Sequence, residues 1–198
     1  MPLLDTLTEV NALHKQGLFT QFGLSNFAAW EVARVVELCR ANGLVQPTIY
    51  QAMYNAITRS AEEELIPCCR AYGLRIVVYN PLAGGLVRLR AEQLQAEQQD
   101  KIELEKGSRF EGSGPGAKRY RERYFKSSYF RALQLLQPIV EEQHGLRLTE
   151  VMLRWLQHHS ELKETDGVIL GASSKEQLVM NCEDRCVHSP WLQSRSTD

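Results

Sequence analysis

The chain has 198 residues, of which 43% are hydrophobic and 24% are charged, a composition typical of a globular protein with one substantial core. Its formal net charge of −1 favours neither nucleic acid nor an anionic membrane surface as a partner. No apolar run approaches the length of a membrane span, and the N-terminal segment lacks the pattern of a secretory signal, so we expect a cytoplasmic protein.

Helical and strand patterns alternate in the first part of the chain. The predicted elements are a helix through Leu4, Leu7, Val10 and Leu13 that closes at Gly17, a strand from Phe19 to Leu24, a helix from Trp30 to Arg40, a strand through Ile49 and Gln51, a helix from Ser60 to Gly73, and a strand from Leu74 to Tyr79. The helix after Trp30 has one apolar face, formed by Val32, Val35, Val36 and Cys39.

The later part of the chain is richer in polar residues and contains one further strand pattern. The predicted elements are a solvated helix or mobile loop at Ala91–Lys106, a loop at Gly107–Gly116, a helix from Lys118 to Gln143 with an interruption or kink near Pro138, a helix capped by Thr149 that runs to His159, a strand from Val168 to Leu170, and a helix that begins at Ser174.

Strands separated by helices indicate parallel βαβ units. Four strands are predicted, whereas a complete barrel has eight. A complete barrel also typically needs about 250 residues, more than the 198 of this chain. We therefore expect an α/β fold, a partial (β/α)8 TIM barrel with roughly the last four strand–helix units.

Three of the predicted strands end in small or amide-bearing residues. These segments are Phe22–Asn26, Tyr79–Gly85 and Val168–Ser174. In a βα-barrel the carboxyl ends of the strands build the ligand site, and glycine lets the backbone approach a ligand closely. The pattern predicts a ligand site at this edge of the sheet.

The five cysteines do not form a recognisable metal or disulfide framework. Cys39, Cys68 and Cys69 fall inside helical patterns, where a buried thiol is the ordinary interpretation. Cys182 and Cys186 lack a second ligand pair at zinc-like spacing, so we assign no metal site.

Four ordered motifs resemble those of the aldo-keto reductases, and among them the aflatoxin-aldehyde reductase subgroup. The motifs are Phe22–Phe27, Tyr50–Asn55, Tyr79–Leu86 and Leu170–Gln177, and the similarity runs from about Leu3 to Asn181. The resemblance implies reduction of small aldehydes and ketones by hydride transfer from NADPH on a (β/α)8 barrel.

The resemblance implies roles at the nicotinamide and pyrophosphate of the cofactor. Ser25, Asn26 and Gln51 would hydrogen-bond the carboxamide, because amide side chains offer both donors and acceptors. Tyr79 would stack beneath the nicotinamide ring. A strap from Asn80 to Arg90 would cover the pyrophosphate, and its cofactor-contacting residues would be Asn80, Pro81, Leu82, Ala83, Gly84 and Gly85.

The resemblance also implies a site for the adenosine end. The hydroxyls of Ser173 and Ser174, together with Lys175, would suit the 2′-phosphate at a helix N-terminus. Gln177 and Asn181, four residues apart on one helical face, would reach the adenine. The two serines are explained equally well as helix caps, a role compatible with phosphate binding. In the loop after the strap, Arg109 would also contact the cofactor.

The segment Tyr120–Phe125 resembles the region that meets an acidic group of the substrate, with Tyr120 and Arg123 in the contacting positions. The wider run Lys118–Lys126 interleaves basic and aromatic residues, which is also seen in nucleic-acid-binding proteins. The near-neutral net charge favours instead a solvated helix face with the aromatic side chains packed inward.

No residue of this sequence is assigned a catalytic role. The family uses an Asp, a Tyr acid, a Lys that lowers the pKa of that Tyr, and a His. The resemblance places all four ahead of the position aligned with Met1, and Tyr54 and Tyr120 are the candidates for a replacement acid. Because the resemblance ends after Asn181, we separate a partial barrel domain, residues 1–181, from a divergent tail, residues 182–198.

Three hypotheses follow. The first is an NADPH-dependent aldo-keto reductase, with a role in secondary metabolism suggested by analogy to the mycotoxin-aldehyde reductases. The second is a non-catalytic NADP-binding or scaffold protein that forms a homo- or hetero-oligomer, because the unpaired strand edges of a half-barrel invite a partner. The third is an inactive truncated product.

Overall fold

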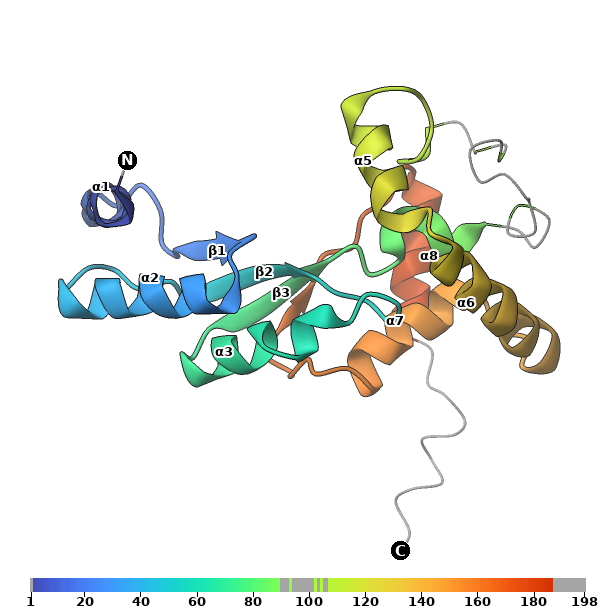
Figure 1. The fold of residues 1–198 in the computed structure, drawn as a ribbon. Coiled ribbons are helices and arrows are strands. Elements are labelled where there is room, and N and C mark those ends of the chain that lie inside the picture. The colour runs from blue at the N-terminus through green and yellow to red at the C-terminus, as the bar shows by residue number, and fades with distance from the viewer. Residues whose placement is uncertain (1, 90–92, 94–101, 103, 105–106, 187–198) are drawn as a thin grey trace, which may run out of the picture. The chain divides into compact units, whose positions relative to one another are not determined.

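The structure, a computed structural model, describes residues 2–89, 93, 102, 104 and 107–186 (Figure 1). The chain divides into two compact units, each with residues from separate parts of the sequence. The first comprises Met1–Tyr54, Thr58–Tyr79 and Glu161–Ile169, and the second comprises Asn55–Ile57, Asn80–Ser160 and Leu170–Asp198.

The first unit is an α/β structure. Its elements in chain order are α1 (Leu3–Lys15), β1 (Gly23–Ser25), α2 (Ala29–Ala41), β2 (Ile49–Met53), η1 (Ser60–Glu62), α3 (Leu65–Ala71), β3 (Arg75–Tyr79) and β4 (Gly167–Val168). The strands form one parallel sheet in the order β1-β2-β3-β4. The predicted parallel βαβ arrangement is confirmed for this part of the chain.

The two faces of the sheet differ in burial. Side chains alternate between the faces along each strand. One face consists of residues that are 7% exposed or less: Leu24, Tyr50, Ala52, Ile76 and Val78. On the opposite face Gln51 and Arg75 are exposed, and Val77 and Tyr79 are half-buried.

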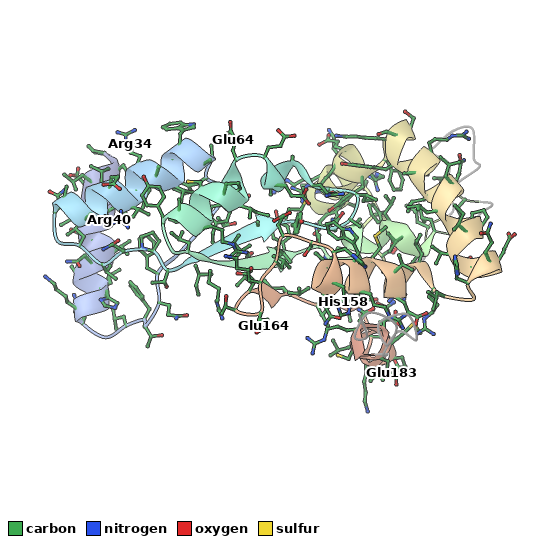
Figure 2. All side chains as sticks on the ribbon, turned by 90° about the horizontal axis from the view of Figure 1, so that it is seen from below. Arg34, Arg40, Glu64, His158, Glu164 and Glu183 are labelled. Carbon is green, nitrogen blue, oxygen red and sulfur yellow. The ribbon has the colours of Figure 1, made fainter. Side chains whose placement is uncertain are left out.

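Helices α2 and α3 cover the buried face of the sheet (Figure 1). The predicted apolar face of α2 is confirmed, with Val32, Val35, Val36 and Cys39 all at most 1% exposed. Charged residues occupy the other side of α2, where Arg34 and Arg40 are exposed to solvent (Figure 2). The periodicity of this segment was thus a sufficient guide to its packing.

The helix predicted from Ser60 to Gly73 starts later than expected. Ser60 begins a short 3₁₀ turn, and the α-helix starts only at Leu65. Trp30, at the start of α2, is 64% exposed. In α1, Leu7 is buried, whereas Leu4 and Leu13 are 36% and 41% exposed.

A buried carboxylate fastens the segment before β4 to the rest of the first unit. The side chain of Asp166 is 1% exposed and forms a two-pronged ion pair with the guanidinium of Arg70. It also accepts hydrogen bonds of 2.8 Å from the backbone N–H groups of Ile76 and Lys163. Burial alone would raise the pKa of Asp166, but Arg70 and the two N–H donors lower it below its ordinary value.

The second unit is helical in its described residues. Its elements are η2 (Ala83–Arg88), α5 (Pro115–Tyr124), α6 (Ser127–Gln137), η4 (Pro138–Gln143), α7 (Leu148–His158) and α8 (Lys175–Cys186). The expectation for Ala91–Lys106 lies almost wholly outside the described residues. Helix α8 continues without a break past Asn181, the residue at which we divided the sequence.

The single helix predicted from Lys118 to Gln143 is two helices. The chain leaves the helical path at Phe125, which has φ −80° and ψ 72°. The turn stacks Phe125 on Phe110 at 5.0 Å between ring centroids and places it edge-on to Phe130 at 5.4 Å. The predicted disturbance at Pro138 is confirmed, because a π-helix begins there.

Thr149 does not cap a helix, contrary to the prediction. Helix α7 starts one residue earlier, and the Thr149 hydroxyl donates a 2.6 Å hydrogen bond to Asp184. The Asp184 side chain is fully buried and also pairs with Arg147. These contacts tie α7 to α8 within the second unit.

Candidate functional site

In the first unit, three of the predicted cofactor residues share one face of the sheet at its carboxyl edge. Ser25 lies opposite Gln51 in the parallel register, and Tyr79, two residues beyond the partner of Gln51, ends β3. Alternation along the strands places all three side chains on the less buried face. Ser25 and Tyr79 are half-buried, and Gln51 is exposed. The structure therefore brings a hydroxyl, an amide and an aromatic ring to one accessible edge.

The turn after β1 is held by a tyrosine to which we had assigned no role. Asn26 adopts a left-handed conformation with φ +61°. The Tyr50 hydroxyl donates a hydrogen bond to the carbonyl of Phe27 at 2.6 Å and accepts one from the N–H of Phe27 at 3.0 Å. Burial raises the pKa of Tyr50, so the hydroxyl stays protonated and able to donate. The sequence did place Tyr50 beside Gln51 in the second motif, and this position was the one indication of its role.

In the second unit, Asn80 is the centre of a hydrogen-bond network. It also has a positive φ, +58°. Its carbonyl accepts hydrogen bonds of 2.9 Å from the Asn55 amide and the Ala83 N–H. Its side-chain oxygen accepts a bond from the Tyr120 hydroxyl at 3.3 Å, and its side-chain nitrogen donates to Tyr124 at 3.2 Å. The start of the predicted strap is thus fixed through both backbone and side chain.

The middle of the strap depends on two glycines. Gly84 and Gly85 have φ of +70° and +102°, a conformation that L side chains rarely adopt. A β-carbon at Gly84 would lie 2.7 Å from Cε1 of Tyr120, whereas one at Gly85 would meet nothing within 4 Å. Leu82 and Ala83 bury their side chains at 7% and 1% exposure. A ligand would therefore meet the strap chiefly through glycine backbone.

Backbone strain in the described residues falls on the predicted cofactor positions. The non-glycine residues with positive φ are Asn26, Asn80 and Ala83, at +61°, +58° and +50°. All three belong to the predicted set. Such conformations cost about 1–3 kcal/mol each and concentrate at ligand and active sites.

The two arginines implied by the resemblance, Arg109 and Arg123, both lie near the ring of Tyr120. The guanidinium of Arg109 lies 5.4 Å from the ring centroid of Tyr120, and that of Arg123 lies 5.8 Å from it. Phe110 and Tyr124, which are 2% and 0% exposed, contact the same ring from 6.1 and 6.2 Å. The aromatic residues of this segment thus pack against one another, as expected for the inward-packed alternative.

The N-terminus of α8 is capped by its own side chains. Ser174 accepts a 3.2 Å hydrogen bond from the Gln177 N–H, and the Gln177 side-chain oxygen accepts bonds from the N–H and the hydroxyl of Ser173. Ser173, Ser174 and Lys175 are exposed. The interpretation of Ser174 as a cap is confirmed, and Gln177 is engaged with Ser173.

Asn181 is buried and holds two other segments of the second unit. It is 1% exposed, accepts a 2.8 Å hydrogen bond from Arg88 and donates one of 3.2 Å to the carbonyl of Gly171. A terminal nitrogen of Arg109 lies 3.7 Å from the position of a β-carbon on Gly171. Arg88, absent from the predicted set, thus ties the end of η2 to α8, and Asn181 in turn holds the loop before α8.

Tyr54, one of the two candidates named for an acid, is held in a buried hydrogen bond. It is fully buried, its hydroxyl donates a 2.5 Å hydrogen bond to Glu62, and burial raises its pKa to about 12.

Among the described residues, no group of three or more His, Cys, Asp or Glu side chains could hold a metal ion. In the same part of the chain, no helix combines the length and apolar character that crossing a membrane requires.

Comparison with known proteins agrees with the motifs. The sequence profile of the aldo/keto reductase family matches residues 1–184. The chain is 44% identical over 185 residues to aflatoxin B1 aldehyde reductase member 2 of Mus musculus, covering 91% of this chain and 49% of that protein. Among human proteins, aldo-keto reductase family 7 member A3 is 44% identical, and the match covers 91% of this chain and 54% of that protein. Human aflatoxin B1 aldehyde reductase member 2 is 43% identical, and the match covers 91% of this chain and 50% of that protein.

The chain spans about half the length of the curated relatives it matches. The profile match covers the elements that carry the strained turns and the strap, from α1 into α8. The chain belongs to the aldo/keto reductase family.

Proposed function

We propose that this chain supplies the cofactor-binding part of an NADPH-dependent aldo/keto reductase that reduces aldehydes or ketones by hydride transfer. The observation that carries the proposal is the coincidence of strain and prediction: the left-handed residues Asn26, Asn80 and Ala83 all lie at expected cofactor positions. Strained backbone persists where the surrounding structure holds it for a purpose, and Tyr50 and Tyr120 provide that support here.

In the first unit, the proposed ligand is the nicotinamide. The accessible Ser25 and Gln51 side chains match a carboxamide, which both donates and accepts hydrogen bonds. Asn26 joins them on the turn held by Tyr50, and the half-buried Tyr79 ring offers a stacking face. When bound, the cofactor would supply the hydride, and these residues would orient the ring that carries it.

In the second unit, the proposed ligands are the pyrophosphate and the adenosine 2′-phosphate. Gly84 and Gly85 allow the strap to approach phosphate oxygens through its backbone, and the side chains of Pro81, Leu82 and Ala83 are buried. Ser173, Ser174 and Lys175 are exposed at the N-terminus of a helix, where an anion is favoured. Arg109, Gln177 and Asn181 complete the proposed set.

Two residues proposed to contact the cofactor, Gln177 and Asn181, already form hydrogen bonds within the protein. Asn181 already bonds Arg88 and Gly171, so it would act by placing that loop rather than by reaching the adenine. Gln177 would contact the adenine on releasing Ser173. For the substrate, the proposal retains Tyr120 and Arg123 as the contacts of an anionic group on a small carbonyl compound.

The proposal assigns little or no turnover to the isolated chain. Proton donation to the carbonyl needs a Tyr whose pKa is brought down toward neutrality, whereas burial raises that of Tyr54 to about 12. The test mixes the purified 198-residue chain, NADPH and 4-nitrobenzaldehyde and follows NADPH oxidation. No oxidation above the protein-free rate is expected, and rapid oxidation would contradict this assignment.

Lys175 offers a matched test of the cofactor assignment. Replacing it by Gln keeps the length and polarity of the side chain and removes the charge that the proposal aligns with the 2′-phosphate. Lys175→Gln should weaken NADPH binding about tenfold, the usual worth of a charge-assisted contact, and leave NADH binding unchanged. An equal effect on both cofactors would remove Lys175 from the proposed set.

The less buried face of the sheet favours a second candidate, a non-catalytic NADP-binding or scaffold subunit. Gln51 and Arg75 are exposed there, and Val77 is half-buried, whereas α2 and α3 cover the opposite face (Figure 1). A partner could cover this face. Size-exclusion chromatography with light scattering decides: a homo-oligomer supports the candidate, and a monodisperse monomer at all concentrations argues against self-assembly.

The cellular compartment and the substrate class are also proposals. Cys39, Cys68, Cys69 and Cys182 are free thiols, which fits a reducing compartment, and we propose the cytoplasm. Relatives named as aflatoxin B1 aldehyde reductases suggest an aldehyde of secondary metabolism as the substrate class. The domain proposal remains a partial barrel over residues 1–181 with a divergent segment after it.

A further inference from the structure

We propose that Tyr120 is a positioning residue that locks the glycine strap and couples it to Arg109 and Arg123. Its ring lies against Gly84, its hydroxyl holds the side chain of Asn80, and the guanidiniums of Arg109 and Arg123 lie within 6 Å of its ring centroid. This role rests on the proposed function for its consequence in cofactor binding, but the lock itself is a property of the protein without ligand.

The lock acts at two points of the strap. At the first point, the hydroxyl bond to Asn80 is one half of a clamp, because Tyr124 bonds the other end of the same amide. Fixing that amide fixes the left-handed backbone whose carbonyl accepts the Ala83 N–H at 2.9 Å. The clamp therefore stabilises the first turn of the strap.

At the second point, the ring fills the space in front of Gly84. Cε1 and Cδ1 of Tyr120 would lie 2.7 and 2.8 Å from a β-carbon at this position. The ring is itself immobilised by edge contacts with the buried Phe110 and by the tilted ring of Tyr124. A rigid ring pressed against the glycine restricts the outward motion of the strap.

The same ring links the strap to the two arginines. Each guanidinium lies within 6 Å of the Tyr120 centroid, the range in which a cation is attracted to an aromatic face. Arg109 is the proposed cofactor contact, and Arg123 is the proposed contact of an anionic substrate. A shift of the ring, caused by a ligand on either arginine, would be felt at Gly84 and Asn80. Tyr120 thus joins cofactor and substrate groups instead of serving the substrate alone.

The lock is tested first without any ligand, by amide hydrogen exchange of the full 198-residue chain. The reporters are the N–H groups of Ala83 and Gly85, which donate to Asn80 and Leu82 inside the strap. Tyr120→Leu removes the ring and should speed exchange at both amides about tenfold. Tyr120→Phe keeps the ring, removes the hydroxyl, and should speed it by about threefold to fivefold.

Tyr72→Leu is the matched control. Tyr72 also carries an arginine on its ring, Arg40 at 5.2 Å, but it lies in the first unit at the end of α3. The control should leave exchange at Ala83 and Gly85 unchanged. Unchanged exchange in Tyr120→Leu, or an equal change in Tyr72→Leu, would overturn the proposal.

A mutant cycle separates the lock from general destabilisation. Asn80→Gly tolerates the positive φ but removes the amide that Tyr120 holds. In that background Tyr120→Phe should have no further effect on exchange, because its bonding partner is gone. An undiminished effect would show that the hydroxyl does not act through Asn80 and would overturn the clamp.

Cofactor affinity provides the functional arm. If the wild-type chain binds NADPH, Tyr120→Leu should weaken binding about tenfold and Tyr120→Phe by a smaller factor. Unchanged affinity in Tyr120→Leu would overturn the coupling. If the wild-type chain binds no NADPH, the proposed function fails, while amide exchange still decides whether the lock exists.

Discussion

The two adjacent glycines of the strap permit a direct test of the packing around the candidate site. Gly84→Ala and Gly85→Ala make the same chemical change one residue apart. Both place a β-carbon on a residue with positive φ, at a cost of about 1–2 kcal/mol. The conformation of Gly85, with φ +102°, lies further from the left-handed minimum than that of Gly84 at +70°. If backbone strain alone mattered, Gly85→Ala would be the costlier change.

The structure predicts the opposite order. At Gly84 the new β-carbon would lie 2.7 Å from Tyr120, and overpacking of this kind typically costs about 1–3 kcal/mol more. At Gly85 no atom lies within 4 Å of the new β-carbon. We therefore expect Gly84→Ala to lower the free energy of unfolding by about 1 kcal/mol more than Gly85→Ala does, measured by urea denaturation and circular dichroism.

The background Tyr120→Leu makes the comparison decisive. Removing the ring should relieve about 1–3 kcal/mol of the Gly84→Ala penalty and leave the Gly85→Ala penalty unchanged. Additive losses for Gly84→Ala and Tyr120→Leu would refute the reasoning, because they would show that the ring does not set the requirement for glycine.

The remaining predictions concern burial and charge. Asp166→Asn should lower the free energy of unfolding by about 3 kcal/mol, because it leaves the Arg70 guanidinium without its charge partner. Glu37→Gln, in an exposed ion pair, should change it by less than about 0.5 kcal/mol, and equal losses in the two variants would contradict the assigned burial. Because the folded-state pKa of Asp166 is lowered, its contribution should be complete above about pH 4 and fall as pH drops further; acid titration of Asp166→Asn should show a smaller loss than wild type. Burial raises the pKa of Cys69 to about 12, so iodoacetamide at neutral pH should label the exposed Cys182 first, and prior labelling of Cys69 in folded protein would contradict the structure.

The sequence predicted those parts of the fold that depend on local periodicity. The apolar face of α2 was read from spacing alone, because one helix side must be buried against the sheet. The parallel order of the strands followed from their alternation with helices. The carboxyl-edge placement of Ser25 and Tyr79 followed from the strand ends, and that of Gln51 from the family resemblance, although the sequence could not reveal which face they share.

The parts that escaped prediction depend on contacts between distant residues. Asp166 gave no signal, since its partner Arg70 lies 96 positions away in the sequence. Thr149 looked like a helix cap, but the helix begins at Leu148. The Thr149 hydroxyl instead donates a hydrogen bond to the buried Asp184. Local rules favour a serine or threonine before a helix, and a tertiary acceptor overrides them here.

The helix break at Phe125 escaped for a related reason. The segment contains neither glycine nor proline near the break, so periodicity alone suggested one helix. The break lets Tyr124 and Phe125 both contact Phe110, which a continuous helix would turn to different sides. The hydrogen bond from Asn80 to Tyr124 shows why this packing matters for the strap.

The most direct test of the central claim is a titration of the purified chain with NADPH, followed by quenching of tryptophan fluorescence, with NADH as the comparison. The account predicts saturable binding that favours NADPH by about tenfold, because exposed Ser173, Ser174 and Lys175 at the start of α8 suit the 2′-phosphate. Absence of saturable binding, or equal affinity for the two cofactors, would contradict the claim that this chain carries an NADPH site.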